Sequence, residues 1–249
     1  MKKLFKVLAV LVLVLSAATL VSCKKNKEVT AKGYGLVNGD YVGVVEIKVK
    51  KGEVTALTFD EVYLPSHWAG IANVEGVDEA LYLSYQGSYG PVNVAKYVMV
   101  GDKKFTAELV EGAPVYSAEG IADLKTWINA SEENAKWYAE AVIAGNAKAT
   151  DASWNKASFK ITADVEGGYT KAATADTYWP AGGYGQGWKA NVEGLAATLV
   201  GTSMGFTESQ IVKGEDGKYT IGGNTTSASL ASMKDYVAVA QRAYNAATK

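Results

Sequence analysis

Three patterns in the amino-acid sequence predict an α+β fold, with largely antiparallel sheets built from hairpins and with helices packed against them. Short runs alternate between apolar and polar residues, as half-buried strands do. Longer runs repeat apolar residues every three or four positions, which is typical of helices that bury one face. The predicted strands come mostly in neighbouring pairs with helices in between, and this order favours α+β over a regularly alternating parallel fold.

Each predicted pair of strands is separated by a short turn that contains glycine. Residues 45–50 alternate Val or Ile with Glu or Lys, and Lys51-Gly52 forms the turn before the next apolar run. The pattern recurs around Gly101-Asp102 and around residues 214–217. A further strand is expected at 159–165, where apolar and polar residues also alternate. The predicted hairpins join 45–50 to 54–62, 92–100 to 105–110, and 211–212 to 219–221.

Helical spacing of apolar residues appears in four segments. Ser131 is expected to cap the second helix, because the acidic residues that follow it suit the positive end of a helix dipole. Gly145 is expected to end that helix. The predicted helices cover 121–128, 132–144, 192–200 and the stretch from about Ser229 to 247.

The length of the chain fits one large folded domain or two small ones. Apolar residues make up 48% of the sequence and only four residues are proline, so the chain is expected to be globular and not disordered. Residues 1–23 are interpreted as a signal peptide and 24–32 as a polar tether. The rest divides into two α+β halves, 33–150 and 151–249, unless 33–249 folds as one domain.

The N-terminus has the layout of an export signal: a lysine-rich start, an aliphatic run at 7–15 and an exit of small residues. The aliphatic run is shorter than the roughly 20 residues that a membrane-spanning helix needs. The sequence Leu-Val-Ser-Cys at 20–23 resembles the bacterial lipoprotein processing box, in which the cysteine is acylated and becomes the new N-terminus. This resemblance implies a lipid anchor on Cys23 and a location on the extracytoplasmic face of the cell membrane. The alternative is an ordinary cleaved signal with an incidental cysteine.

The composition excludes several classes of site. Cys23 is the only cysteine, so the folded part has no disulfide, no thiolate metal site and no cysteine nucleophile. His67 is the only histidine, which excludes a zinc site with several histidines and a Ser-His-Asp triad at any other position. No metal site is therefore expected. The formal net charge is −1 and no basic stripe is present, so no nucleic-acid partner is expected either.

Two pairs of carboxylates, Asp60-Glu61 and Asp78-Glu79, have the chemistry for acid–base work or calcium binding. Neither has the spacing of a calcium loop, so both are expected to be solvated surface charge. His67 lies in a turn-like stretch beside Trp68 and is expected to be a loop residue and not a catalytic base.

The motif that says most about function lies at residues 223–230, immediately before the last predicted helix. Thr226, Ala228 and Ser229 match the flavin-attachment motif of the FMN-binding domain family, which this segment resembles. In that family the motif is an acidic residue, two variable residues, Ser or Thr, Gly, Ala, and a final Ser or Thr whose hydroxyl is esterified to the FMN phosphate. The resemblance implies FMN as cofactor, with Ser229 as the acceptor and Thr226, Ser227 and Ala228 beside it.

Two positions depart from this motif: Ser227 stands where the family has Gly, and Gly223 stands where it has an acidic residue. The flanks fit better, because the hairpin before the motif and the helix after it look like the family's C-terminal context. Residues 39–54 also look like the opening strand pair of such domains. Apart from the resemblance, the hydroxyls at 226, 227 and 229 are interpreted more simply as caps of the last helix.

A Gly-aromatic loop at 178–188 is the second candidate for ligand contact. Its glycines allow a ligand to approach the backbone closely, and Trp179, Tyr184 and Trp188 offer flat rings that would stack on an isoalloxazine. The alternative is that these aromatic side chains pack on the protein core. The six Trp and 15 Tyr of the chain would equally suit a carbohydrate or peptide groove.

The expected function is therefore that of a lipid-anchored extracytoplasmic FMN-binding protein that carries electrons. The resemblance implies a membrane electron donor and a flavin transferase as partners. Such a carrier needs no acid–base residues of its own, because the cofactor supplies the chemistry. The alternative from another class is a flavin-free ligand-binding or surface-adhesion lipoprotein, which the departures at Ser227 and Gly223 favour. A metal-independent hydrolase is the third alternative.

Overall fold

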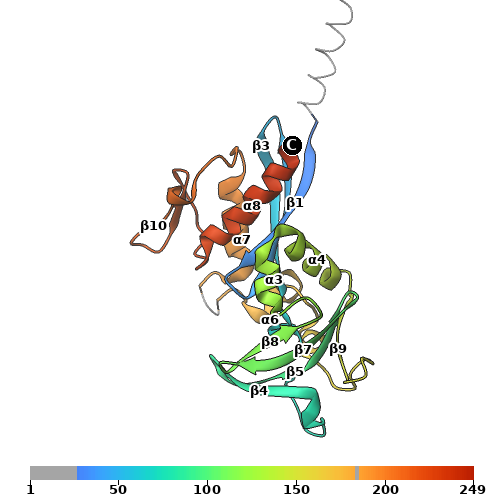
Figure 1. Cartoon of the computed structure of the whole chain (residues 1–249). Helices are drawn as coiled ribbons and strands as arrows, with labels where there is room; N and C mark the ends of the chain where they lie inside the picture. The colour runs from blue at the N-terminus through green and yellow to red at the C-terminus, as the bar shows by residue number, and fades with distance from the viewer. Residues whose placement is uncertain (1–26, 183–184) are drawn as a thin grey trace, which may run out of the picture.

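The structure is a computed structural model that describes residues 27–182 and 185–249. Within these ranges, seven helices and twelve strands form antiparallel sheets with packed helices, which confirms the predicted α+β class (Figure 1). The predicted lipidation site Cys23 and the predicted stacking residue Tyr184 lie outside the described residues.

The fold begins with a three-stranded antiparallel meander, β1 (Val29–Val37), β2 (Tyr41–Lys50) and β3 (Glu53–Tyr63). The predicted first hairpin is confirmed as β2 and β3. The elements that follow are α2 (Pro65–Trp68), η1 (Glu79–Leu81), β4 (Tyr82–Gly87), β5 (Gly90–Ala95), β6 (Tyr97–Val100), β7 (Lys103–Val110), β8 (Ala113–Ser117), α3 (Leu124–Ala130), α4 (Glu132–Ile143) and β9 (Ala147–Thr150). The last part comprises α5 (Thr162–Glu166), α6 (Lys171–Tyr178), α7 (Gly187–Leu199), η2 (Glu208–Gln210), β10 (Ile211–Lys213), β11 (Tyr219–Ile221), β12 (Asn224–Thr225) and α8 (Met233–Thr248).

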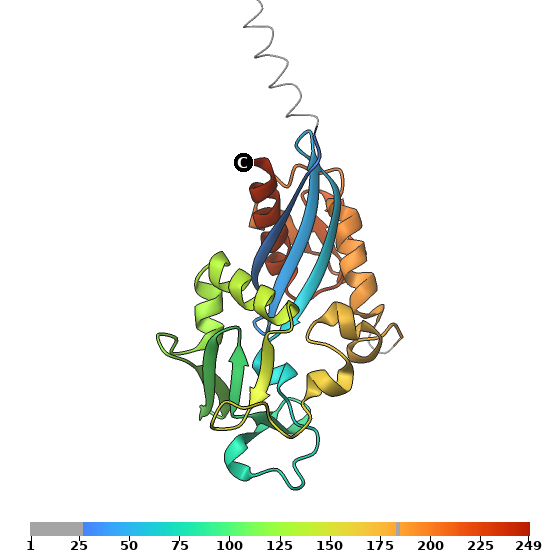
Figure 2. The ribbon, with the colours of Figure 1, turned by 90° about the vertical axis from the view of Figure 1, so that its right-hand side faces the viewer.

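The meander packs against the last helices of the chain. Helices α7 and α8 lie on one face of it, α7 against β3 and α8 against β1 and β2 (Figure 2). A hydrophobic core forms there from strand residues such as Val45 and Ile47 and helix residues such as Leu195 and Val237. Residues from the first and last parts of the sequence therefore share one core.

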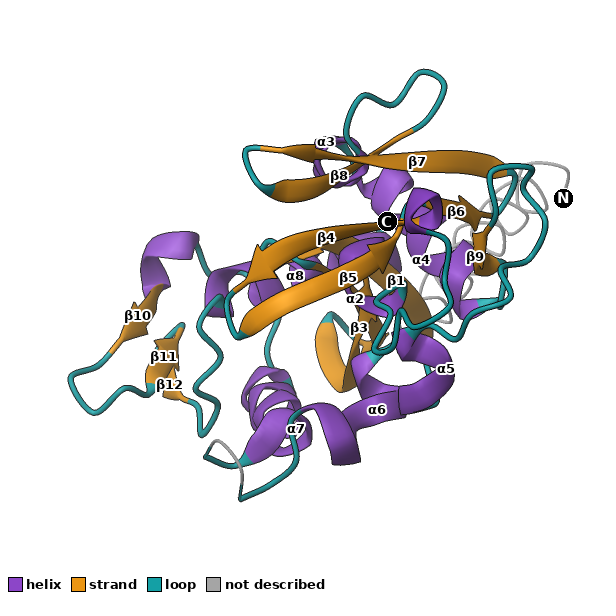
Figure 3. Ribbon diagram, turned by 90° about the horizontal axis from the view of Figure 1, so that it is seen from below, coloured by secondary structure: helices purple, strands orange, loops and turns teal. Residues whose placement is uncertain are grey.

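A second core lies at the other end of the meander. It packs the four-stranded sheet β8-β7-β6-β9 and helices α3 and α4 around Trp68, which is fully buried. The indole N–H of Trp68 donates to the hydroxyl of Tyr138, and that hydroxyl donates to the backbone carbonyl of Tyr63 at the end of β3. The β4–β5 hairpin borders this sheet, whereas the small β10-β11-β12 sheet lies apart from both (Figure 3).

The other two predicted hairpins are also confirmed, as β6–β7 and β10–β11. Residues 92–95 belong instead to β5, which pairs with β4. Ser131 caps α4 as expected, because its hydroxyl accepts the backbone N–H of Asn134 at 3.1 Å.

The strand expected at 159–165 is wrong, because this segment folds into the short helix α5. No partner strand is beside it within the described residues, and the N–H of Thr162 donates instead to the backbone carbonyl of Gly70 at 2.7 Å. The carboxylate of Asp164 accepts the N–H of Ile161, and Gly167 ends the helix in the left-handed conformation at φ +83°. Alternation over so few residues does not distinguish a strand from one helical turn.

The start expected for the last helix, near Ser229, is also wrong: α8 begins at Met233 with Ser232 at its N-cap position. Residues 226–230 form a turn outside any helix or strand, in which buried and exposed residues alternate. The hydroxyls at 226, 227 and 229 therefore do not cap α8.

Helix α8 approaches β1 closely at Gly33. A Cβ atom there would overlap the carbonyl oxygen of Val239 and lie 2.5 Å from the backbone nitrogen of Ala243. We predict that Gly33→Ala lowers the free energy of unfolding by about 1–3 kcal/mol, because the helix must shift away from the sheet. Gly205→Ala is the matched control, since its Cβ would meet nothing closer than 3.6 Å. Urea denaturation of both variants measures the difference, and equal stabilities would contradict the close packing.

Candidate functional site

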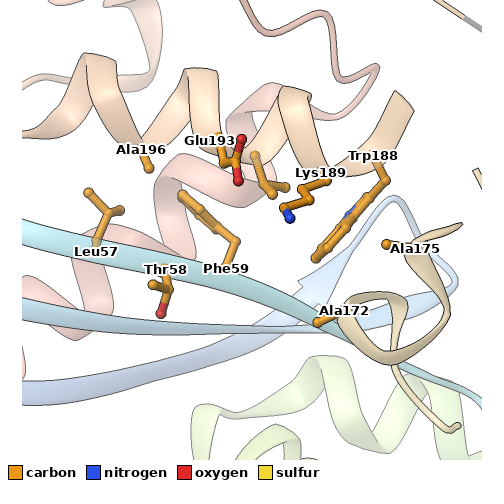
Figure 4. A pocket seen from close by; sticks show the side chains of 10 residues that line it. Leu57, Thr58, Phe59, Ala172, Ala175, Trp188, Lys189, Glu193 and Ala196 are labelled. Carbon is orange, nitrogen blue, oxygen red and sulfur yellow. The ribbon is translucent and has the colours of Figure 1, made fainter. Parts of the chain in front are cut away.

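A groove runs between β3 and α7, and Figure 4 shows it from close by. Its volume is about 290 Å³. Apolar side chains dominate its walls, and three alanines leave space between the helices and the strand. The lining residues are Leu57, Thr58, Phe59, Ala172, Ala175, Trp188, Lys189, Val192, Glu193 and Ala196.

Trp188 reaches this groove because the Gly-aromatic loop turns sharply just before it. Gly187 has φ +78°, and a Cβ atom there would lie 2.7 Å from the backbone nitrogen of Ala181. The N–H of Trp188 donates to the carbonyl of Trp179, which closes the loop. Only a glycine fits position 187, so the loop sets the direction in which α7 begins.

Trp188 packs in the core and is 3% exposed, as the alternative interpretation of this loop expected. Its indole N–H donates to the carboxylate of Glu61 in β3. The indole N–H is therefore committed inside the protein, and a ligand in the groove meets the ring of Trp188 and not its donor.

Glu61 is completely buried, so the expectation that Asp60-Glu61 is solvated surface charge is wrong for Glu61. One carboxylate oxygen accepts the indole N–H of Trp188 from α7 and, at 2.7 Å, the hydroxyl of Tyr236 from α8. The other oxygen lies 2.6 Å from the ammonium of Lys171 in α6. The alternation of β3 in the sequence already indicated that Glu61 is buried, because Glu61 falls on the same side of the strand as Leu57, Phe59 and Tyr63.

Lys171 is almost as buried as its partner, with 5% of its side chain exposed. Its ammonium also lies 3.7 Å from the centroid of the Tyr41 ring, a cation–π contact. Burial lowers the pKa of Lys171, and the negative charge of Glu61 opposes that shift. Asp60, next along β3, is half-buried and accepts the N–H of Ala172, so it helps to cap α6.

We predict that Lys171→Met lowers the free energy of unfolding by about 3–5 kcal/mol, because it leaves the carboxylate of Glu61 buried without a counter-ion. The double variant Glu61→Gln with Lys171→Met is expected to recover part of this loss. Lys32→Met is the control, since the pair between Lys32 and Glu46 is about half exposed and worth at most about 1 kcal/mol. Equal losses for the buried and exposed pairs in chemical denaturation would contradict this assignment.

His67 lies in the one-turn helix α2 and stacks on Tyr63, with ring centroids 4.0 Å apart. Its Nε2 is 3.5 Å from a carboxylate oxygen of Glu166. Burial lowers the pKa of His67 from its ordinary value, and this effect outweighs the attraction of Glu166.

Because the folded state holds His67 at a lower pKa than the unfolded state, the unfolded state binds more protons at mildly acidic pH. We therefore predict full stability above about pH 6.5, with a loss as the pH falls from there through the folded pKa. The His67→Gln variant is expected to lack this part of the pH dependence, since the chain has one histidine. Thermal unfolding of both proteins between pH 8 and pH 5 measures this difference. If the melting temperatures of the two proteins fell equally with pH, the lowered pKa of His67 would be contradicted.

The predicted flavin-attachment residues pack against the side of α7, and every second side chain among them is buried. Thr226 and Ala228 are buried, whereas Ser227 and Ser229 are exposed. The hydroxyl of Thr226 accepts the N–H of Ala228 at 3.1 Å and donates to the carbonyl of Gly194. These bonds fix a tight turn in which Ser227 and Ser229 are exposed residues, while the hydroxyl of Ser227 faces Gly194 and that of Ser229 donates to Asn191.

Asn191 of α7 is fully buried and binds the acceptor residue expected from the sequence. Its side-chain oxygen accepts the backbone N–H of Ser229 at 2.7 Å and the hydroxyl of Ser229 at 3.2 Å. Gln186 donates to the same oxygen and to the carbonyl of Ser227. Sequence reasoning missed Asn191, because nothing in its spacing marks it apart from a polar helix residue.

The groove and the attachment motif lie on different faces of α7. At 3.6 residues per turn, Asn191 and Gly194 face roughly half a turn away from Lys189, Glu193 and Ala196. The structure therefore places Ser229 away from Lys189, Glu193 and Ala196, whereas Trp188, three residues before Asn191, lies between the two faces. Trp179 is half-buried at the end of α6 and packs against the same core as Trp188.

No protein-family model matches the chain, and no curated protein or solved structure is significantly similar to it. In the described part of the chain, none of the helices has both the length and the apolar character to cross a membrane. The same residues contain no group of three or more His, Cys, Asp or Glu side chains placed to hold a metal ion.

Proposed function

We propose that this protein is a lipid-anchored, extracytoplasmic FMN carrier in which Ser229 holds the flavin phosphate as an ester. The observation that carries this proposal is the turn at 226–230. It buries the side chains at 226, 228 and 230, leaves Ser229 exposed and orients the hydroxyl of Ser229 by a bond to Asn191. A modifying enzyme needs an accessible hydroxyl in a fixed orientation, and this turn supplies one.

The departures from the family motif are consistent with the local geometry. Ser227 replaces the family's glycine, and its hydroxyl occupies the space that a Cβ atom on Gly194 would take. The glycine thus needed for close packing is at position 194 of α7. Gly223 has φ +91° and no atom within 4 Å of its would-be Cβ, so its role is conformational.

In this role the protein's own residues bind and orient the cofactor, and the flavin supplies the redox chemistry. The anchor on Cys23 would keep the carrier at the membrane, beside a membrane electron donor. A flavin transferase would load it. The protein needs no catalytic acid or base for either step.

We predict that the Cys23→Ser protein, expressed with a flavin transferase and flavin adenine dinucleotide, gains the mass of one FMN less one water, because the serine oxygen displaces AMP from the diphosphate of the dinucleotide. Ser229→Ala is expected to abolish the gain, and the neighbouring Ser227→Ala is expected to retain it. Ser229→Ala preserves the backbone N–H bond to Asn191, so the turn stays intact. Intact mass and visible absorption are the measurements.

Two other outcomes are distinguishable. Yellow protein without a mass gain would mean a non-covalent site and would overturn the ester at Ser229. Colourless, unmodified protein that fails to bind added FMN would contradict the proposed flavin carrier. It would favour a flavin-free ligand-binding or surface-adhesion lipoprotein.

A further inference from the structure

The groove between β3 and α7 opens on the face of α7 that carries Lys189, Glu193 and Ala196, which points away from the predicted attachment motif. It is built from the ring of Trp188, the ring of Phe59 and the aliphatic side chains of Leu57 and Val192. Figure 4 shows the rings of Phe59 and Trp188 on either side of the Lys189 side chain, and Ala172, Ala175 and Ala196 are further lining residues. The chemistry of the walls selects a flat, apolar ligand.

The size of the groove limits that ligand. Sites that bury a drug-sized molecule have volumes of about 300–1,000 Å³, and this groove has about 290 Å³. It therefore holds one compact ring system and not a whole mononucleotide. Because the indole N–H of Trp188 is committed to Glu61, the ring system is recognised by contact with aromatic faces and edges.

Charge at the groove distinguishes one end from the other. Lys189 is the only cation among the lining residues, and no described acid lies within 4 Å of its ammonium. In Figure 4 its side chain extends between Phe59 and Trp188. Glu193 stands one turn further along α7 and repels an anion from that end of the groove. An anionic group is thus favoured beside Lys189 at the Trp188 end.

We propose that this groove is a binding site for a planar aromatic carboxylate of one or two fused rings. The rings lie against Phe59 and Trp188, and the carboxylate pairs with Lys189. The ammonium forms a charge-assisted bond with the carboxylate at the edge of an apolar surface, where such bonds are stronger than between neutral groups.

The test is calorimetric titration of the unmodified protein, never exposed to a flavin transferase, with 2-naphthoate and with the neutral 2-naphthamide. We expect 2-naphthoate to bind and 2-naphthamide to bind at least about tenfold more weakly. Lys189→Gln is expected to remove this preference for the anion. Lys160→Gln is the matched control, since Lys160 is an exposed lysine outside the groove, and it is expected to bind like the unaltered protein.

Ala196→Phe fills the groove and is expected to abolish binding of both probes, with Ala175→Leu as a second filling variant. The indole N–H resonance of Trp188 provides an independent readout, which is expected to shift with 2-naphthoate and to stay in place when either filling variant is titrated. Absence of binding at millimolar 2-naphthoate, or binding unchanged by both filling variants, would overturn the proposal. Neither result bears on the modification of Ser229, because the protein is tested without flavin.

Discussion

The buried carboxylate of Glu61 is the interaction on which the rest of this structure depends. It receives donors from three helices: Lys171 from α6, Trp188 from α7 and Tyr236 from α8. An unpaired carboxylate at full burial would cost several kcal/mol, so the three donors must be present together. Glu61 thereby joins the C-terminal helices to β3, a strand near the start of the sequence. The groove and the predicted attachment motif both depend on the position that this junction gives to α7.

Helix α7 contacts the turn at 226–230 with one face and lines the groove with another. One face carries Asn191 and Gly194, which hold the turn that contains Ser229. The other carries Lys189, Glu193 and Ala196, which line the groove. An α-helix with its side chains is about 10–12 Å across. The residues that hold Ser229 and the residues at Lys189, Glu193 and Ala196 are therefore separated by the width of the helix.

Local patterns predicted the elements whose geometry is set locally. The turns at Lys51-Gly52 and Gly101-Asp102 each contain a glycine at positive φ, and both hairpins are where their turns placed them. The cap at Ser131 is equally local. The expected strand at 159–165 failed because alternation alone does not reveal whether a partner strand exists. The start of α8 was misplaced because the hydroxyls of Thr226 and Ser229 bond to α7 and do not cap a helix.

Tertiary contacts decided what the sequence could not reveal about the site. Asp60 and Glu61 are adjacent acids of the same strand, yet one caps a helix near the surface and the other is completely buried. A carboxylate on the apolar side of a strand conflicts with the pattern around it, and such conflicts occur where a fold trades stability for a specific arrangement. Here the conflict marks the point where three helices meet β3. Had Glu61 been a leucine, the core would lose no apolar area, but the indole N–H of Trp188 would lose its acceptor and the ammonium of Lys171 its counter-ion. The carboxylate of Glu61 therefore specifies how α6, α7 and α8 pack against β3. This packing forms the groove between β3 and α7.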